Sequence, residues 1–292
     1  MVSLAIQQEE TGVGRATIWG CGAIALWSFL AVLTRFAAAI PPLQLTAMVF
    51  AVAALFGGAI LAALGRLGEL RQPPLVWAHG VGGLFGYHAL YFMALSLAPA
   101  AQANLLNYAW PLLIVLFSAA LPGMRLGLNH LGGVVLAAAG AVLLMGGAEG
   151  FLLAALPGYA CALGCAVVWA GYSVLARLLA RVPTGAVAGF CAATAVLAAL
   201  VHLGTETTVI PSAREWGLVA LMGIGPTGAA FFLWDYGMKR GDPRLLGTLA
   251  YATPITSTLL LCAAGQATAS LRLLGAAALV ATGGLVAALR RR

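Results

Sequence analysis

Ten apolar runs of about twenty residues each, separated by short breaks, constrain the fold more than any other feature of this chain. A helix of that length crosses the roughly 30 Å of hydrocarbon in a bilayer. Backbone inside hydrocarbon must satisfy its own hydrogen bonds, so each run is expected to be a helix. The expected helices span 15–38, 43–64, 74–97, 101–121, 128–147, 154–180, 184–204, 213–239, 243–262 and 270–290. The sequence therefore predicts an all-α membrane protein with ten transmembrane helices.

Composition excludes a soluble domain. Only 8% of the residues are charged and 62% are hydrophobic, whereas soluble domains carry about 25% charged residues.

The breaks between the apolar runs contain turn-forming residues, such as those at 122–123 and 241–243. Residues 1–14 lack a basic region followed by an apolar core, so we expect an N-terminal tail rather than a cleaved signal peptide.

The basic residues predict the orientation of the chain in the membrane. If the N-terminus lies in the cytoplasm, twelve of the 15 Lys and Arg residues fall on the cytoplasmic side. Only Arg35, Arg214 and Arg272 fall outside. Cytoplasmic loops are enriched in Lys and Arg, so both termini are expected in the cytoplasm. The same rule explains the net charge of +7 without a nucleic acid partner.

The second half of the chain repeats the first at an offset of 142–143 residues. The matches include Trp27 with Trp169, Arg35 with Arg177, Pro41 with Pro183, Tyr108 with Tyr251, and Pro111 with Pro254. Each half has five helices, an odd number, so the second copy must cross the membrane in the opposite sense. Inverted repeats of this kind are typical of secondary transporters, with the substrate site near the midplane. The sequence predicts two five-helix repeats, 15–147 and 154–290, around a central cavity.

Polar and aromatic side chains concentrate on the first, third, fourth, sixth, eighth and ninth expected helices. On the third and fourth helices they lie within an arc of about 100°. These six helices are predicted to line the cavity. The candidate substrate-binding residues are Trp27, Leu84, Tyr87, His88, Tyr91, Asn104, Asn107, Tyr108, Trp169, Tyr172, Ser173, Trp234 and Tyr251. The other four helices are rich in small and aliphatic residues. Spacings such as Gly133/Ala137 and Gly283/Ala287 indicate close helix contact there.

Individual polar residues have two interpretations each. His88 is ionisable at mid-membrane, which favours contact with substrate or cavity over a packing role. For Trp27 and Trp169, lining and packing remain equally open. Asp235 lies one turn before Lys239, and the two are expected to pair near the cytoplasmic end. The remaining candidates, Pro111 and Pro254, are expected to kink their helices or act as hinges.

The expected cavity is uncharged, aromatic and amide-bearing, which suits planar solutes and the ends of a zwitterion. The five cysteines lie within apolar runs and are expected to be small buried hydrophobes rather than disulfides or metal ligands. No cofactor or metal is expected. The chain lacks a phosphate-binding loop and an H-E-x-x-H motif, which argues against an ATP-driven motor and an intramembrane metalloenzyme. A carrier of organic phosphates would need Lys or Arg at mid-span, and the expected cavity has none, which argues against that class of transporter.

The run GYHALYFMAL (86–95), followed by AQANLLNYAWPLLIVLFS (101–118), gives the chain a family resemblance. Together with the ten-helix duplication, it resembles the EamA-type branch of the drug/metabolite transporter superfamily, and within it the bacterial aromatic amino acid exporters. The resemblance implies a secondary transporter of the bacterial inner membrane, not an enzyme, that exports aromatic and other neutral amino acids by alternating access. It implies a monomer or weak homo-oligomer that contacts lipid and a small-molecule substrate. The alternative is proton-coupled export of another small metabolite or a cationic drug.

Overall fold

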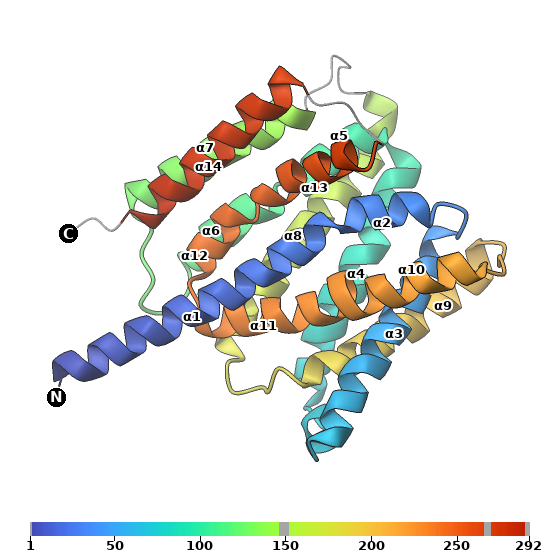
Figure 1. Ribbon diagram of the computed structural model, residues 1–292, viewed down its shortest axis with the longest axis horizontal. Helices are drawn as coiled ribbons and strands as arrows, with labels where there is room; N and C mark the ends of the chain where they lie inside the picture. Colours follow the sequence, from blue (N-terminus) through green and yellow to red (C-terminus); the bar gives the residue numbers. More distant parts are fainter. Residues whose placement is uncertain (1, 146–151, 266–269, 290–292) are drawn as a thin grey trace.

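The computed structural model describes residues 2–145, 152–265 and 270–289, and every regular element in these ranges is a helix (Figure 1). Seven helical segments of the described chain are long and apolar enough to cross a membrane. They are Gly12–Phe36, Pro42–Ala63, Pro74–Leu97, Leu153–Leu178, Ala186–Thr205, Ala213–Arg240 and Pro243–Ala263. Two further apolar helices, Leu128–Gly140 and Leu271–Ala287, are shorter. The all-α membrane class predicted from the sequence is confirmed.

The first half of the chain holds seven α-helices and one 3-10 turn. These are α1 (Val2–Ser28), α2 (Leu30–Phe36), α3 (Pro42–Ala63), η1 (Leu67–Leu70), α4 (Pro74–Leu97), α5 (Ala100–Asn107), α6 (Trp110–Ser118) and α7 (Leu128–Met145). Helix α4 has the predicted bounds. Helix α1 begins at Val2 rather than at residue 15, so the predicted tail 1–14 is helical from Val2 onward. The predicted end of the fifth helix, at 146–147, lies outside the described residues.

Within its described residues, the second half holds seven α-helices, one 3-10 turn and one π-helical turn. It holds η2 (Leu153–Ala155), α8 (Leu156–Leu178), α9 (Ala186–Thr205), α10 (Ala213–Ile224), the π-helical turn η3 (Gly225–Ala229), α11 (Ala230–Arg240), α12 (Pro243–Leu249), α13 (Ala252–Ala263) and α14 (Leu271–Ala288). The predicted last residue of the tenth helix, 290, and the basic residues 290–292 lie outside the described residues.

Proline interrupts three of the predicted helices. Pro111 is the second residue of α6, and the chain turns at 108–109 just before it. Proline has no N–H, so the carbonyl four residues earlier loses its helical partner. Pro254 follows a turn at 250–251 in the same way. Pro226 lies in the π-helical turn η3, which separates α10 from α11.

The helices pack mostly across the two halves of the chain. Helix α3 lies against α9, α4 against α8, α1 against α11, α6 against α12, and α7 against α14. Figure 1 shows the α7–α14 pair on one side of the molecule and the α3–α9 pair on the opposite side, with α1, α8 and α11 between them. The centre of the molecule is therefore built by helices from both halves.

The α7–α14 contact depends on small residues. A Cβ atom on Gly133 would lie 2.6 Å from the carbonyl oxygen of Gly283 and 2.7 Å from the Cβ of Ala287. A Cβ on Gly283 would lie 2.8 Å from the backbone nitrogen of Ala137. The close contact predicted from these four residues is confirmed.

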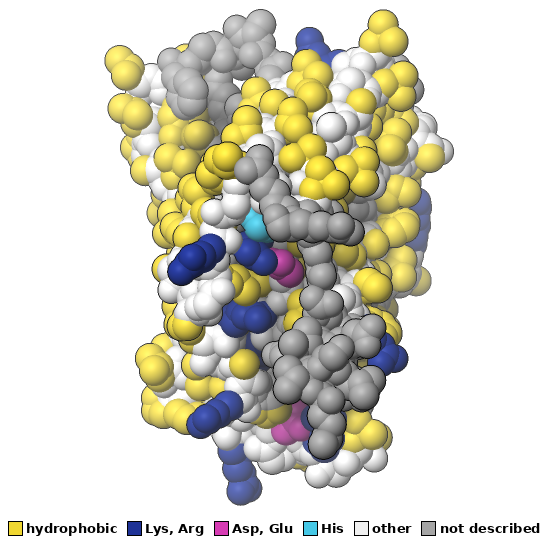
Figure 2. All heavy atoms as spheres, turned by 90° about the vertical axis from the view of Figure 1, so that its left-hand side faces the viewer, with side chains coloured by type: hydrophobic (Ala, Val, Ile, Leu, Met, Phe, Trp, Pro, Cys, Tyr) yellow, Lys and Arg dark blue, Asp and Glu magenta, His cyan; other side chains and the backbone are white. Residues whose placement is uncertain are grey.

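One end of the molecule gathers basic side chains; we call it the basic end. It is the end where α1 begins and α11 ends, and Figure 2 shows Lys and Arg side chains spread over it. Arg177 Nη1 donates to the carbonyl of Gly241 at 2.6 Å, and Arg244 Nη1 donates to that of Arg125 at 2.8 Å. Burial works to raise the pKa of Asp242, but its hydrogen bonds with Arg244 outweigh this and hold the pKa below its ordinary value.

At the opposite end, a carboxylate joins α9 to α3. Glu206 accepts hydrogen bonds from the backbone nitrogens of Leu43 and Gln44 at 3.0 and 3.1 Å, which satisfies the first turn of α3. His202 Nδ1 lies 2.8 Å from Glu206 Oε2. The α3–α9 pair is therefore fixed at this end by polar contacts as well as by packing.

Candidate functional site

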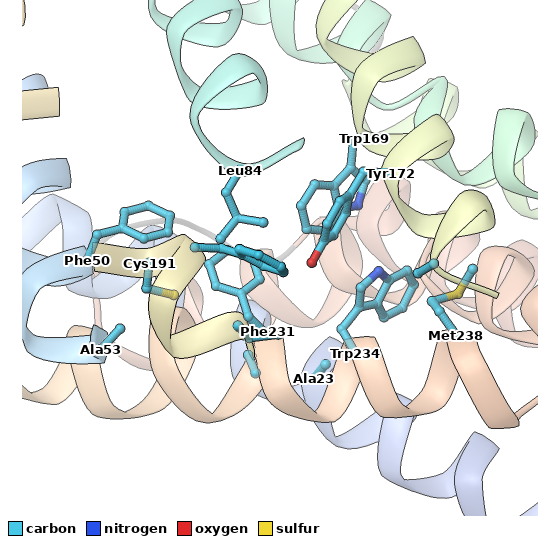
Figure 3. Packing of buried hydrophobic residues seen from close by; sticks show 14 of the residues in the cluster. Ala23, Phe50, Ala53, Leu84, Trp169, Tyr172, Cys191, Phe231, Trp234 and Met238 are labelled. Atoms are coloured by element: carbon cyan, nitrogen blue, oxygen red, sulfur yellow. The ribbon is translucent and has the colours of Figure 1, made fainter. Parts of the chain in front are cut away.

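Six aromatic side chains meet at the centre of the molecule. We call Trp27 (α1), Trp110 (α6), Trp169 and Tyr172 (α8), and Phe231 and Trp234 (α11) the aromatic cluster. Ring centroids lie 5.1 Å apart for Trp27 and Trp234, and 5.8 Å apart for Trp169 and Phe231. Figure 3 shows the α8 rings turned toward the α11 rings. These separations are those of favourable aromatic contacts.

Two indole N–H groups of the aromatic cluster have defined acceptors. Trp27 Nε1 donates to the carbonyl of Pro226, in the π-helical turn, at 3.0 Å. Trp234 Nε1 donates to Ser173 Oγ at 3.0 Å. Buried indoles need such partners, so these bonds fix the orientation of both rings.

A glycine makes room for the cluster between α4 and α8. A Cβ atom on Gly83 would collide with the ring of Tyr172, and one on Gly80 would collide with the ring of Phe190. Gly82, by contrast, has open space around the position of a Cβ. The Tyr172 ring therefore lies directly over the backbone of α4.

Amide and phenol groups form a second layer on α4 and α5. Tyr91 Oη donates to Asn104 Oδ1 at 2.6 Å, and Asn107 Nδ2 donates to Tyr87 Oη at 3.1 Å. The Tyr87 ring lies 5.2 Å from the ring of Trp169. Tyr87, Tyr91, Asn104 and Asn107 are thus brought together as one polar layer beside the aromatic cluster.

His88 is half-buried beside this layer. Its Nδ1 donates to the carbonyl of Leu84, one turn earlier in α4, at 2.7 Å. Its ring meets Phe50 edge to face at 5.0 Å and Tyr87 at 5.2 Å. Leu84 itself is fully buried in the core. In this arrangement His88 packs against aromatic rings, and contact with a substrate stays a prediction.

One candidate residue, Tyr251, lies elsewhere. Tyr251 is 2% exposed and packs in a separate apolar cluster with Val115, Ile255 and Leu273. It stands in the turn before α13, which directs it toward α14 rather than toward the aromatic cluster. Tyr108 is half-buried in the corresponding turn between α5 and α6. Tyr108 and Tyr251 match in the sequence repeat, but Tyr251 does not lie beside the six rings of the aromatic cluster.

Trp110 is a cluster member that the sequence-based prediction lacks. Its ring lies 6.0 Å from that of Trp234 and 6.4 Å from that of Trp169. Its position immediately before Pro111, at the start of α6, was the available signal, because the break in the helix turns this residue inward. Phe231, one turn before Asp235 on α11, is not among the candidate substrate-binding residues, although it lies on a helix predicted to line the cavity.

The central cavity predicted from the sequence stays a prediction, and the structure brings these six rings into contact at the place expected for it. Two cavities of about 340 Å³ each lie elsewhere. One lies on α3 and α9 and is lined by Ala47, Met48, Ala51, Ala195, Val196 and Ala199. The other lies at the basic end, and Phe56, Arg66, Glu69, Thr184 and Phe232 are among its lining residues. Neither is lined by a member of the aromatic cluster.

A buried ion pair lies next to the aromatic cluster. Lys239 Nζ is 2.8 Å from Asp235 Oδ2, and the two side chains are only 5% and 4% exposed. Lys239 also donates to the carbonyl of Val182 at 3.0 Å, and Thr184 Oγ1 donates to Asp235 Oδ2 at 2.7 Å. The pairing predicted from the i, i+4 spacing is confirmed, and it joins α11 to the loop between α8 and α9.

The thiol side chains are free, and Cys165 and Cys191 are buried. Cys165 Sγ donates to Asn107 Oδ1 at 3.2 Å. Within the described residues, no three or more His, Cys, Asp or Glu side chains gather in a way that would hold a metal ion.

Comparison with known proteins adds to this geometry. The model of the EamA-like transporter family matches residues 14–146 and 156–289. The chain is 53% identical to the aromatic amino acid exporter YddG of Ancylobacter novellus, over 95% of this chain and 98% of that protein. It is 26% identical to the YddG of Salmonella typhimurium, over 84% of this chain and 87% of that one. A solved crystal structure, 52% identical, superimposes with a TM-score of 0.91 over 94% of this chain and 96% of its own.

Proposed function

The chain belongs to the EamA-like transporter family, and we propose that it exports aromatic and other neutral amino acids from the bacterial cytoplasm. Members of this family are membrane transporters and not enzymes. The observation that carries the proposal is the 53% identity, over nearly the full length of both chains, to a protein named as an aromatic amino acid exporter. The aromatic cluster gives that likeness a physical basis in this chain.

The cluster supports recognition of an aromatic side chain. Four helices, α1, α6, α8 and α11, place rings that contact one another at the centre of the molecule. An incoming indole or phenyl ring can exchange ring–ring contacts with these side chains, and each such pair contributes about 0.5–1.5 kcal/mol. The polar layer of Tyr87, Tyr91, Asn104 and Asn107 offers hydrogen bonds next to them.

Alternating access requires two halves that can exchange conformations, and the packing supports such a duplication. If 15–147 and 154–290 are inverted repeats with ten crossings, α1 corresponds to α8, and α4 corresponds to the α10–α11 segment. Exchanging the halves then turns the α1–α11 contact into the α8–α4 contact. The α3–α9 and α7–α14 contacts each map onto themselves. The turns at 108–109 and 250–251 also correspond. This pattern supports a two-fold relation between the halves, which inverted repeats have.

The basic end is the side we place in the cytoplasm, with both termini. Basic loops are retained on the cytoplasmic side during insertion, and Arg177 and Arg244 are held there by the backbone carbonyls of Gly241 and Arg125. Export then moves the amino acid from the basic end to the end that carries Glu206. Without a nucleotide site, its own concentration gradient is the simplest driving force.

Transport by the purified protein tests the proposal. Proteoliposomes would be given labelled tryptophan, phenylalanine or threonine, with and without a pH gradient, and compared with empty liposomes. Saturable flux of tryptophan and phenylalanine that does not need the gradient is expected. Flux that requires a proton gradient, or that occurs for a cationic drug but not for any amino acid, would replace this function with the proton-coupled alternative.

A further inference from the structure

We infer that Asp235 and Lys239 bind the two charged ends of the transported amino acid, Asp235 its ammonium group and Lys239 its carboxylate. This inference rests on the proposed function. In the structure described here, the two side chains satisfy each other at 2.8 Å. In the transport cycle, the zwitterion would take the place of that internal contact.

Asp235 and Lys239 are charged residues in the buried interior of the protein, where charged side chains are rare. Among the described residues, Asp235 and Lys239 are the only Asp, Glu, Lys or Arg side chains in the buried interior. Burying two charges costs several kcal/mol per ion before their attraction is counted, so a buried ion pair is a poor device for stability alone. Ionisable residues within membrane segments usually mark a substrate or ion pathway.

The position of the pair fits the length of an aromatic amino acid. Asp235 directly follows Trp234 and lies one turn after Phe231, both members of the aromatic cluster. Four residues correspond to about 6 Å along a helix, and residues i and i+4 share a face. A ring held in the cluster is therefore one helical turn from the carboxylate. The two carbons between the ring and the charged groups of the substrate can bridge that step.

The chemistry of transfer also calls for such a pair. A zwitterion that leaves water needs a countercharge or strong hydrogen bonds at both ends. The aromatic cluster supplies neither, whereas Asp235 supplies the acceptor and Lys239 the donor. Exchange of one internal ion pair for two pairs with the substrate leaves the net charge of the site at zero. The amino acid can thus enter without an uncompensated charge in the low-dielectric interior.

The loop between α8 and α9 gives the pair a defined closed state. Val182 accepts from Lys239 Nζ, and Thr184 donates to Asp235 Oδ2. When the loop and α11 separate, both charged groups lose these neutral partners at the same time as they lose each other. The substrate ends are the groups that can then satisfy them.

The test compares tryptophan with two analogues, each lacking one charged group. Tryptamine has no carboxylate, and indole-3-propionate has no ammonium group. Their inhibition constants against labelled tryptophan flux, and their binding to the purified protein, would be measured for the wild type, Asp235→Asn and Lys239→Gln. We expect Asp235→Asn to lower the ratio of the inhibition constant of indole-3-propionate to that of tryptophan by about tenfold or more, and to leave the tryptamine-to-tryptophan ratio unchanged. Lys239→Gln should lower the tryptamine-to-tryptophan ratio and leave the indole-3-propionate-to-tryptophan ratio unchanged.

Matched controls separate this role from a structural one. Glu69→Gln and Arg66→Gln break a partly exposed ion pair at the same end, at 2.5 Å, and should leave both ratios unchanged. Asp235→Glu and Lys239→Arg keep the charges and should largely restore the ratios. If a single variant does not fold, the Asp235→Asn/Lys239→Gln double variant leaves no unpaired buried charge and should lose both discriminations.

Equal changes for all three ligands in both variants would show that the pair only holds the structure together, and would overturn the inference while the proposed function stands. Unchanged ratios would overturn it equally. A wild-type protein that neither binds nor moves tryptophan would remove the proposed function itself.

Discussion

Trp27 and Trp169, 142 residues apart and matched in the sequence repeat, lie ring against ring with centroids 5.6 Å apart. Their planes meet at 72°, an edge-to-face contact. Two matched positions that touch each other lie where the two halves of the chain meet. The contact between these tryptophans is therefore the place to test whether the aromatic cluster acts as one unit.

We expect Trp27→Ala and Trp169→Ala each to lower tryptophan flux by about tenfold or more, because each removes several ring contacts of the cluster. Each should also destabilise the protein, by about 3–5 kcal/mol for a buried tryptophan such as Trp169. The double variant should be less destabilised than the sum, by about 0.5–1.5 kcal/mol, since the pair contact is lost only once. Thermal unfolding in detergent and proteoliposome flux measure both effects.

Trp19→Ala is the control, because Trp19 is 56% exposed on α1 and lies outside the cluster. It should keep normal flux. Strict additivity of the two cluster variants, or unchanged flux in both, would count against the cluster as a substrate site.

The glycines at 82 and 83 give a second prediction. Gly83→Ala should lower the melting temperature and the flux, because the added methyl group collides with the Tyr172 ring and displaces it from Trp169. The cost of such overpacking is about 1–3 kcal/mol. Gly82→Ala has free space and gains helix propensity, so its stability should be unchanged or higher by up to about 1 kcal/mol. Equal effects of the two substitutions would mean that the Tyr172 ring does not lie over Gly83.

The α7–α14 contact gives a third prediction. Gly133→Ala places a methyl group against the Gly283 carbonyl and Ala287, so the two helices must separate and lose packing, at about 1–3 kcal/mol. In Gly132→Ala the new methyl group meets only Val286, at an ordinary 3.8 Å, and should be tolerated. Thermal unfolding of the two variants side by side measures the difference. A melting temperature for Gly133→Ala equal to that of Gly132→Ala would contradict the close contact.

Local signals were sufficient for part of this structure. Pro73 precedes α4, Pro74 is its first residue, and Pro99 follows it, which explains why its bounds agree with the predicted 74–97. The Asp235–Lys239 pair was predictable because residues i and i+4 on one helix meet whatever the helix packs against. The π-helical turn at Gly225–Ala229 was not predictable, because the apolar run 213–239 continues through it.

Contacts between distant segments were beyond the sequence pattern. An arc of polar residues on a helix shows which residues share a face, but not which neighbour that face meets. Tyr251 shares an arc with Pro254 and still packs against α14 rather than the aromatic cluster. The hydrogen bond from Trp27 to Pro226 joins residues 199 positions apart, and only the packing of α1 beside α11 creates it. The contacts among the six rings of the aromatic cluster are a result of the same packing.

Membrane topology provides the last prediction, through two matched positions. Ala39 and Arg181 are both exposed and are separated by the repeat offset of 142 residues, two positions before Pro41 and Pro183. In a variant without its native cysteines, Ala39→Cys and Arg181→Cys would be exposed one at a time to a membrane-impermeant maleimide, in right-side-out and inside-out vesicles. Inverted repeats place the equivalent positions on opposite faces, so Arg181→Cys should react from the cytoplasmic side and Ala39→Cys from the outer side. Parallel repeats would place both on one face, and labelling of both cysteines from the same side would exclude the alternating-access arrangement proposed for this chain.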